Sequence, residues 1–142
     1  MWYVSCEEWV NENYPRYNIK LATSQNGIDW EQNGLVSIKL KKGERAIARP
    51  CVIKEKKIYK MWYCFETVVG KYRMGYAESK NGIKWTRKDK KILFPLGKKN
   101  EFDSDMTAYP YVVKYKNKKF MFYNGNLYGK DGIGLAIENK NK

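Results

Sequence analysis

The sequence of 142 residues carries 28 Lys and Arg against 15 Asp and Glu, contains 15% aromatic residues and lacks histidine. This apolar and aromatic content excludes a disordered chain, and no apolar run approaches the roughly 20 residues of a membrane-spanning helix. The lack of histidine excludes Ser-His and Cys-His catalysis within the chain, and three cysteines without a CxxC pair leave no donor set typical of a metal site.

A repeat of about 60 residues organises the chain. Two strings recur at this spacing: MWY at 1–3 returns at 61–63 and as MFY at 121–123, and ARPCVIK at 48–54 returns as AYPYVVK at 108–114. The segments between turns are short, aromatic and β-branched, which indicates strands. We therefore divide the single domain, 1–142, into repeat units of about 1–45, 46–105 and 106–142.

The middle unit is complete. Four antiparallel strands are expected in it, at about Ala46–Lys54, Ile58–Glu66, Tyr72–Ser79 and Trp85–Leu93. The second strand carries apolar side chains on both faces, so its sheet must be covered on both sides. Stacked four-stranded sheets of about 60 residues each are typical of a β-propeller, in which neighbouring blades sandwich one another.

The strings SQNGIDW at 24–30 and SKNGIKW at 79–85 join the third strand of a blade to the fourth. Their Asn-Gly pair favours a two-residue type I′ hairpin, in which both central residues take positive φ. The serines can accept hydrogen bonds from turn amides, and the tryptophans can pack on the outer strand. We interpret the motif as structural, and it resembles the Asp-box turn of sialidases.

The first and last units are incomplete. The chain opens at the equivalent of a second strand and ends after the equivalent of a third, which predicts three, four and three strands. This is an all-β, partial β-propeller of about 2.5 blades. A closed propeller needs at least four blades, so the chain is either the C-terminal part of a longer ancestral protein or associates with copies of itself. We expect a homo-oligomer, a dimer or larger, that covers the exposed blade faces.

The excess of positive charge falls mainly in expected turns, with KEKK at 54–57, KDKK at 88–91 and KNKK at 116–119. Lysines spread over several turns make a solvated surface rather than one groove, which argues against nucleic acid as the partner. The string GKDGIG at 129–134 has no following helix, so no phosphate cradle or other cofactor site is expected. We interpret the cysteines as core residues of a cytoplasmic protein that does not bind a membrane.

Three stretches, ARPCVIKEKKIYKMWYCFE, YRMGYAESKNGIKWTR and FDSDMTAYPYVVKYKNKKFMFYNGNLYGKDGIGLAI, resemble the five-bladed β-propeller glycosidase superfamily of glycoside hydrolase families 43 and 32. More narrowly, they are similar to the C-terminal half of glycosidase-like proteins associated with bacterial surface-glycan biosynthesis. The resemblance implies a carbohydrate substrate or ligand. It also implies an acidic residue before the proline of an inner strand, where this chain has Arg49 and Tyr109. Two functions therefore stay open, a glycoside hydrolase and a non-catalytic carbohydrate-binding or assembly module.

Strand direction places the candidate site residues at one end of the blades. In an up-and-down blade, the start of strand one, the end of strand two and the join from strand two to strand three lie together. The side chains at this end suit a sugar site: carboxylates can act as acid or base, amides and guanidinium groups can bind hydroxyls, and aromatic rings can pack on the apolar face of the sugar. The catalytic candidates are Asp105, Asp103 and Glu66, and the substrate-binding candidates are Arg49, Arg45, Tyr109, Asn124 and Asn126.

Each candidate also has a structural interpretation. Residues two apart on a strand share a face, so Asp103 and Asp105 could point together, but FDSDM could instead be an inter-blade turn. Glu66 could be a solvated strand end. The two arginines could join neighbouring blades through carboxylates, and the YNGN string at 123–126 is equally good turn chemistry.

Overall fold

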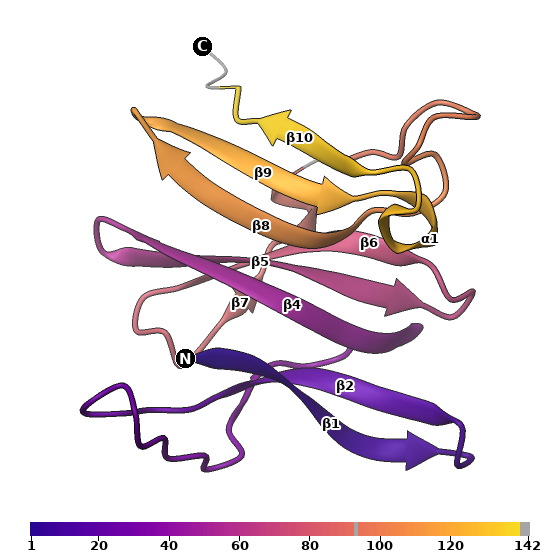
Figure 1. The fold of residues 1–142 in the computed structure, drawn as a ribbon. Helices are drawn as coiled ribbons and strands as arrows, with labels where there is room; N and C mark the ends of the chain where they lie inside the picture. The colour runs from indigo at the N-terminus through magenta and orange to yellow at the C-terminus, as the bar shows by residue number, and fades with distance from the viewer. Residues whose placement is uncertain (93, 140–142) are drawn as a thin grey trace.

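The computed structural model describes residues 1–92 and 94–139, and within them the chain forms three antiparallel sheets stacked on one another (Figure 1). The first sheet holds β1 (Trp2–Val10), β2 (Tyr14–Leu21) and β3 (Val36–Ile38); the second holds β4 (Glu44–Glu55), β5 (Ile58–Thr67), β6 (Tyr72–Ser79) and β7 (Thr86–Arg87); the third holds β8 (Ala108–Tyr115), β9 (Lys118–Asn124) and β10 (Ile133–Ile137). Each sheet follows chain order. The predicted strand counts of three, four and three are confirmed, as is the all-β partial propeller.

The core lies between the sheets, because β5 buries both of its faces. On one face Met61 and Tyr63 pack against Ile19 of the first sheet, and all three side chains are inaccessible to solvent. On the other face Trp62 packs with Val112 of the third sheet. The alternation of apolar residues along β5 therefore builds two inter-sheet layers from one strand, as expected for a blade with a neighbour on each side.

The fourth strand of the middle blade is shorter than predicted. Only Thr86–Arg87 pairs with β6, and the chain then forms a 3₁₀ turn at Asp89–Lys91; Leu93 lies outside the described residues. The side chain of Asp89 is the physical reason, since its Oδ1 accepts the hydrogen bond of the Tyr76 amide at 3.1 Å. A side-chain acceptor thus replaces the backbone of a continuing strand.

The prediction of type I′ hairpins is wrong. In each Asn-Gly pair only the glycine takes positive φ, 75° at Gly27 and 74° at Gly82. The loop is held by side chains instead: Ser79 Oγ accepts the Gly82 amide at 2.9 Å, and Asn81 Oδ1 accepts the next two amides at 3.0 Å. The structural role of the motif is confirmed, and both loops lie at the end of the molecule opposite helix α1 (Asn126–Gly129; Figure 1).

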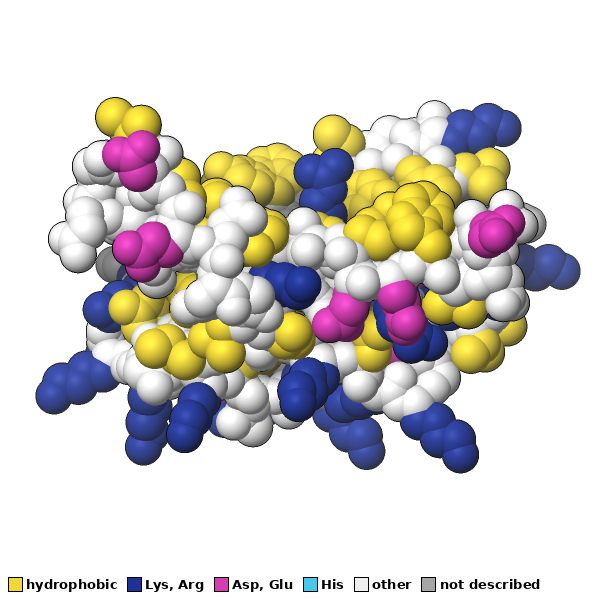
Figure 2. Space-filling model, turned by 90° about the horizontal axis from the view of Figure 1, so that it is seen from below, with side chains coloured by type: hydrophobic (Ala, Val, Ile, Leu, Met, Phe, Trp, Pro, Cys, Tyr) yellow, Lys and Arg dark blue, Asp and Glu magenta, His cyan; other side chains and the backbone are white. Residues whose placement is uncertain are grey.

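Within residues 1–92 and 94–139, no segment covers the two outermost sheet faces. On the third sheet, Tyr111, Phe122 and Leu135 pair across β8, β9 and β10, and all three side chains are exposed. The first sheet presents a mixed face, on which Figure 2 shows apolar side chains interspersed with basic and acidic ones. The middle sheet, by contrast, is covered on both sides.

Candidate functional site

The strands β4 and β8 bulge at equivalent positions, directly before a proline. The register jumps there: Ala48 pairs with Cys64 and Cys51 with Trp62, while Ala108 pairs with Asn124 and Tyr111 with Phe122. The first bulged residues, Arg49 and Tyr109, take the left-handed conformation, with φ of 56° and 55°. This backbone costs a non-glycine residue on the order of 1 kcal/mol. Bulges of this kind are over-represented beside active sites because they redirect a side chain.

A groove of about 560 Å³ lies between the two bulges. Its lining comes from both strands: Arg49, Pro50, Cys51, Val52, Tyr109, Pro110 and Tyr111. The floor is tied together across the sheets, because the Val112 amide donates to Cys51 Sγ at 3.2 Å. The repeat therefore gives this groove two matching walls, one from each blade.

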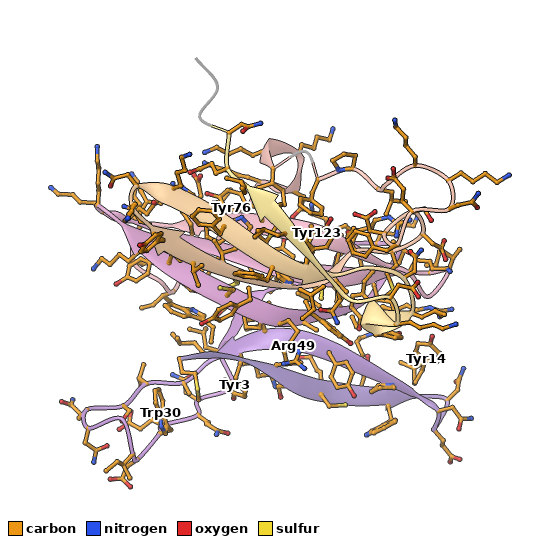
Figure 3. All side chains as sticks on the ribbon, turned by 45° about the horizontal axis from the view of Figure 1, so that its top comes forward. Tyr3, Tyr14, Trp30, Arg49, Tyr76 and Tyr123 are labelled. Carbon is orange, nitrogen blue, oxygen red and sulfur yellow. The ribbon has the colours of Figure 1, made fainter. Side chains whose placement is uncertain are left out.

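A cluster of aromatic rings supports one wall of the groove. The ring of Tyr109 stacks on that of Tyr128, with the ring centroids 5.9 Å apart and an angle of 24° between the ring planes. The centroid of the Tyr109 ring also lies 6.0 Å from that of Tyr72. The guanidinium of Arg49, which extends from β4 (Figure 3), lies over the same Tyr109 ring at 5.0 Å. Asn124 holds Tyr128 in place, because the Asn124 Nδ2 donates a hydrogen bond to the Tyr128 carbonyl at 2.6 Å. The cluster therefore brings three of the predicted binding residues together.

Tyr72 and Tyr128 were not among the sequence-based candidates. Tyr128 is half exposed and also has a left-handed backbone, with φ of 60°. Tyr72 begins β6, directly after the turn that follows β5. The sequence did contain a signal for both tyrosines. They lie at or near the joins between second and third strands, and these joins define the end of the blades that carries the other candidates.

Arg45 and Asn126 serve contacts within the chain. Arg45 Nη1 donates to Tyr14 Oη at 2.5 Å, and its guanidinium lies over that ring. The Asn126 Oδ1 accepts the amides of Asp105 and Met106 at 2.8 and 3.0 Å, and its Nδ2 donates to the Glu101 carbonyl at 3.1 Å. Asn126 thus braces the loop that carries two of the candidate acids.

The two candidate aspartates face different partners. Asp105 is exposed and forms an ion pair with Lys71. Asp103 is buried, and its Oδ2 accepts the Tyr123 hydroxyl at 2.7 Å. The segment from 101 to 107 is a loop rather than a strand, so the alternation that would align the two carboxylates does not apply. The inter-blade turn interpretation of FDSDM agrees with this geometry.

The setting of Asp103 repeats a motif of the middle blade. Tyr123 lies over Gly134 just as Tyr63 lies over Gly75, because a Cβ on either glycine would come within 2.4 and 2.2 Å of the tyrosine ring. Each tyrosine then donates to a carboxylate, Tyr63 to that of Asp89 at 2.6 Å. The repeat of this contact indicates that Asp103 holds the fold of its blade.

Glu66 lies half-buried near the end of β5. Burial raises the pKa of its carboxyl above the ordinary value, and the nearby positive charge of Arg45 opposes that rise. A carboxyl with a raised pKa can remain protonated closer to neutrality, as a general acid requires. Glu66 is therefore the candidate acid whose surroundings most favour proton donation.

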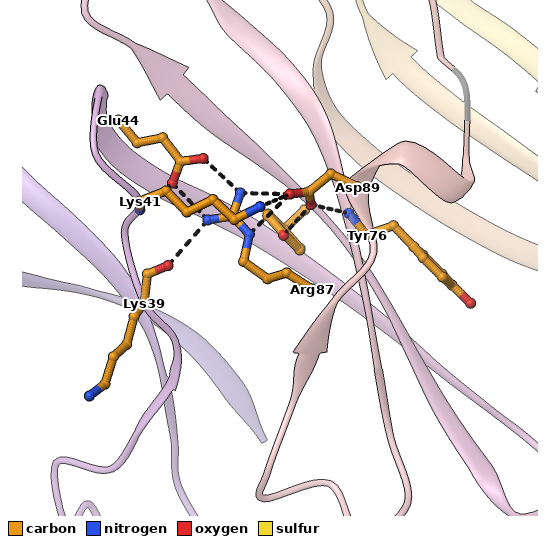
Figure 4. Close-up of polar contacts among 7 residues, drawn as sticks. Lys39, Lys41, Glu44, Tyr76, Arg87 and Asp89 are labelled. Carbon is orange, nitrogen blue, oxygen red and sulfur yellow. Dashed lines mark hydrogen bonds and ion pairs between the residues drawn. The ribbon is translucent and has the colours of Figure 1, made fainter.

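A buried ionic network joins the first two sheets away from the groove (Figure 4). Arg87 donates to both carboxylate oxygens of Glu44 at 2.7 Å and to the Lys39 carbonyl at 3.2 Å. The same guanidinium pairs with Asp89 at 3.0 Å. Since Lys39 lies in the segment that connects the two sheets, the network fixes one blade relative to the next.

Residues 1–92 and 94–139 hold no group of three or more metal-ligating side chains. Within the same ranges, no helix has the length and apolarity needed to cross a membrane.

No protein-family model matches the sequence. The uncharacterized proteins MT1551 and Rv1502 of two Mycobacterium tuberculosis strains are each 34% identical over 140 residues, which is 96% of this chain and 46% of theirs. The chain thus spans about half the length of the curated relatives that it matches.

Solved structures of glycoside hydrolases share the fold. Zg3597, a family 117 glycoside hydrolase of Zobellia galactanivorans, superimposes with a TM-score of 0.73 and 28% identity over 86% of this chain and 38% of its own. The family 32 β-fructofuranosidase of Bombyx mori superimposes with a TM-score of 0.70 at 15% identity, over 99% of this chain and 31% of the fructofuranosidase chain. The chain therefore adopts part of a propeller-like fold that is found in glycoside hydrolases.

Proposed function

We propose that the chain supplies a carbohydrate-binding groove of a glycosidase-like β-propeller. The observation that carries the proposal is the pair of left-handed bulges at Arg49 and Tyr109, which face one groove from two successive blades. Residues held in strained backbone conformations cluster at active and ligand-binding sites.

The chemistry of the groove suits a sugar. Its volume of about 560 Å³ falls within the range of small-molecule sites. The exposed ring of Tyr111 can pack against the apolar face of a sugar ring, while guanidinium and hydroxyl groups bind its hydroxyls. Neither Arg49 nor Tyr109 is acidic, which favours binding over hydrolysis at this position.

The structural comparisons support a glycan-related role, because proteins described as glycoside hydrolases share the fold. The curated relatives are uncharacterized, and the chain corresponds to about half of their length. In our proposal it is the C-terminal half of a propeller of the family 43/32 superfamily that acts in bacterial surface-glycan biosynthesis.

Direct binding tests the proposal. Isothermal titration of the 142-residue chain with a panel of neutral and acidic oligosaccharides should detect at least one ligand. Tyr109→Asn removes the ring while suiting the left-handed backbone, and it should weaken binding about tenfold or more. Tyr115→Phe, on an exposed tyrosine at the far end of β8, is the control. An unaltered affinity in Tyr109→Asn would refute the assignment of the groove.

A second function, glycoside hydrolysis, is favoured by one observation, the raised pKa of Glu66. In that case Glu66 would be the acid and Asp105 the second carboxylate. Release of nitrophenol from aryl glycosides should then fall at least a hundredfold in both Glu66→Gln and Asp105→Asn. Turnover that survives in both variants would exclude this pair.

We also propose that two copies of the chain associate. Two copies would bring 20 strands together, the number in five four-stranded blades. The uncovered apolar face of the third sheet, with Phe122 and Leu135, is the surface that a second copy would bury.

A further inference from the structure

Arg49 differs from the other arginines in its contacts. Across residues 1–92 and 94–139, its guanidinium makes neither a hydrogen bond nor an ion pair, and the residue is exposed. The other four are all engaged: Arg16 with Glu8, Arg45 with Tyr14, Arg73 with the Tyr72 and Asp105 carbonyls, and Arg87 with Glu44 and Asp89. The five N–H donors of Arg49 are therefore available to an external acceptor.

The position of this guanidinium is nevertheless defined. The bulge of β4 directs Arg49 toward the groove, and the Tyr109 ring holds its charge by a cation–π contact at 5.0 Å. Tyr109 is held in turn by the rings of Tyr128 and Tyr72. Because the cation is already oriented, a ligand would lose less side-chain entropy in binding it than in ordering a free arginine.

Among the described residues, no acid lines the groove beside this cation. Its other lining residues are Pro50, Cys51, Val52, Tyr109, Pro110 and Tyr111, all without negative charge at neutral pH. Glu66 lies outside this lining; burial raises the pKa of its carboxyl, and the positive charge of Arg45 opposes that rise. The groove thus combines one positive charge with apolar and aromatic walls.

A carboxylate matches this combination better than a hydroxyl. The planar guanidinium presents parallel N–H groups that bind both oxygens of a carboxylate, and such charge-assisted pairs are about twice as strong as neutral hydrogen bonds. A sugar ring attached to that carboxylate could pack against the exposed ring of Tyr111. We infer that the groove recognises a carbohydrate that carries a carboxylate, a uronate unit, with Arg49 as the residue that reads the charge. This inference rests on the proposed sugar-binding function and adds its specificity.

Trigalacturonate and its methyl ester form a matched pair of probes, because esterification removes the charge and retains the sugar. Isothermal titration of the 142-residue chain should show trigalacturonate binding about 10- to 100-fold more tightly than the ester. Arg49→Gln should abolish this preference, because it should weaken the binding of trigalacturonate and leave that of the ester unaltered. Arg49→Lys should recover part of the preference. Lys57→Gln, in the turn between β4 and β5, makes the same change in net charge outside the groove and should leave both affinities unaltered.

The outcomes separate the inference from the function on which it rests. Equal binding of acid and ester, with no effect of Arg49→Gln, would overturn the uronate assignment and leave sugar binding intact. Failure of trigalacturonate, its ester and the neutral oligosaccharides to bind would overturn both. Competition by inorganic phosphate at the same concentration as the uronate would also refute the assignment, since it would indicate a general anion site.

Discussion

The guanidinium of Arg87 binds both carboxylate oxygens of Glu44 at 2.7 Å, with only 10% and 8% of the two side chains exposed. Removing one partner of a buried pair leaves an uncompensated charge, which is costly. Arg87→Ala should therefore lower the free energy of unfolding by about 3–5 kcal/mol in urea denaturation. Arg16→Ala, at the exposed pair with Glu8, should cost at most about 1 kcal/mol. Equal losses in the two variants would contradict a structural role for the network.

Acid should destabilise the fold through Glu55 and Glu78. Hydrogen bonds from Lys60 and from Lys88, respectively, lower the pKa of each carboxyl to about 2. A depressed pKa means that the folded state favours the carboxylate, so its stabilisation is present above about pH 4.5 and is lost as the pH falls toward 2. Thermal unfolding followed by circular dichroism between pH 7 and pH 2 should show this loss.

The double variant Glu55→Gln and Glu78→Gln should be less stable at neutral pH and should respond less to acid over that window. Glu8→Gln, at an exposed pair, is the control. A wild-type acid response in the double variant would assign the effect to other groups.

Gly75 leaves room for the ring of Tyr63, because a Cβ there would lie 2.2 Å from a ring carbon. Gly75→Ala should therefore destabilise the chain by about 1–3 kcal/mol. In the background of Tyr63→Leu, the same substitution should cost less, since the ring is gone. Equilibrium unfolding of the four members of this double-mutant cycle measures the coupling, and additive costs would disprove the contact.

Asn126 holds the loop of residues 101–106 with both ends of its amide. Asn126→Ala should cost about 1–3 kcal/mol and expose that loop to proteolysis. Asn126→Asp keeps the acceptor for the amides of Asp105 and Met106 but loses the donor, so it should fall between the wild type and Ala. Cleavage at the same rate in all three proteins would show that the loop is held by other contacts.

The uncovered face of the third sheet should mediate self-association. Light scattering of the wild-type chain should give the mass of a dimer or a larger oligomer. Phe122→Lys places a charge at the centre of that face and should shift the mass to that of a monomer. Ile28→Lys, on an exposed loop of the first unit, should have no effect. A wild-type monomer over a wide concentration range would refute the association.

The architecture could be predicted because the sequence repeats with a period of about 60 residues. Strings 60 residues apart, such as those around Met61 and Met121, fix which strands are equivalent, and alternation along β5 shows that both faces are buried. Local turn geometry was less accessible. The Asn81 side chain accepts hydrogen bonds from turn amides in place of the backbone, and the Asp89 side chain does the same at the outer strand. Local sequence propensity therefore gave the wrong turn type at Asn81 and too long a strand before Asp89.

The candidate site was predictable only in part. Strand direction placed Arg49, Tyr109 and Asn124 at one end, and they do meet around one aromatic cluster. What the sequence could not supply was the direction of each side chain. The left-handed backbone of a bulge and the hydrogen bond of Asp103 to Tyr123 depend on contacts between segments that lie far apart in the chain.

The bulge of β4 separates the stability of its blade from the identity of the residue that it presents. The residue before the proline projects by backbone conformation, and the chain already places two unlike side chains, a guanidinium and a phenol, in the same conformation at φ of 56° and 55°. Arg49 is exposed, so it can be exchanged without remaking the hydrophobic layers between the sheets, whereas Tyr109 packs against the buried cluster that includes Ala48 and Cys64. This makes the bulge at Arg49 a natural place to redesign ligand preference, with a new side chain introduced on an unaltered scaffold.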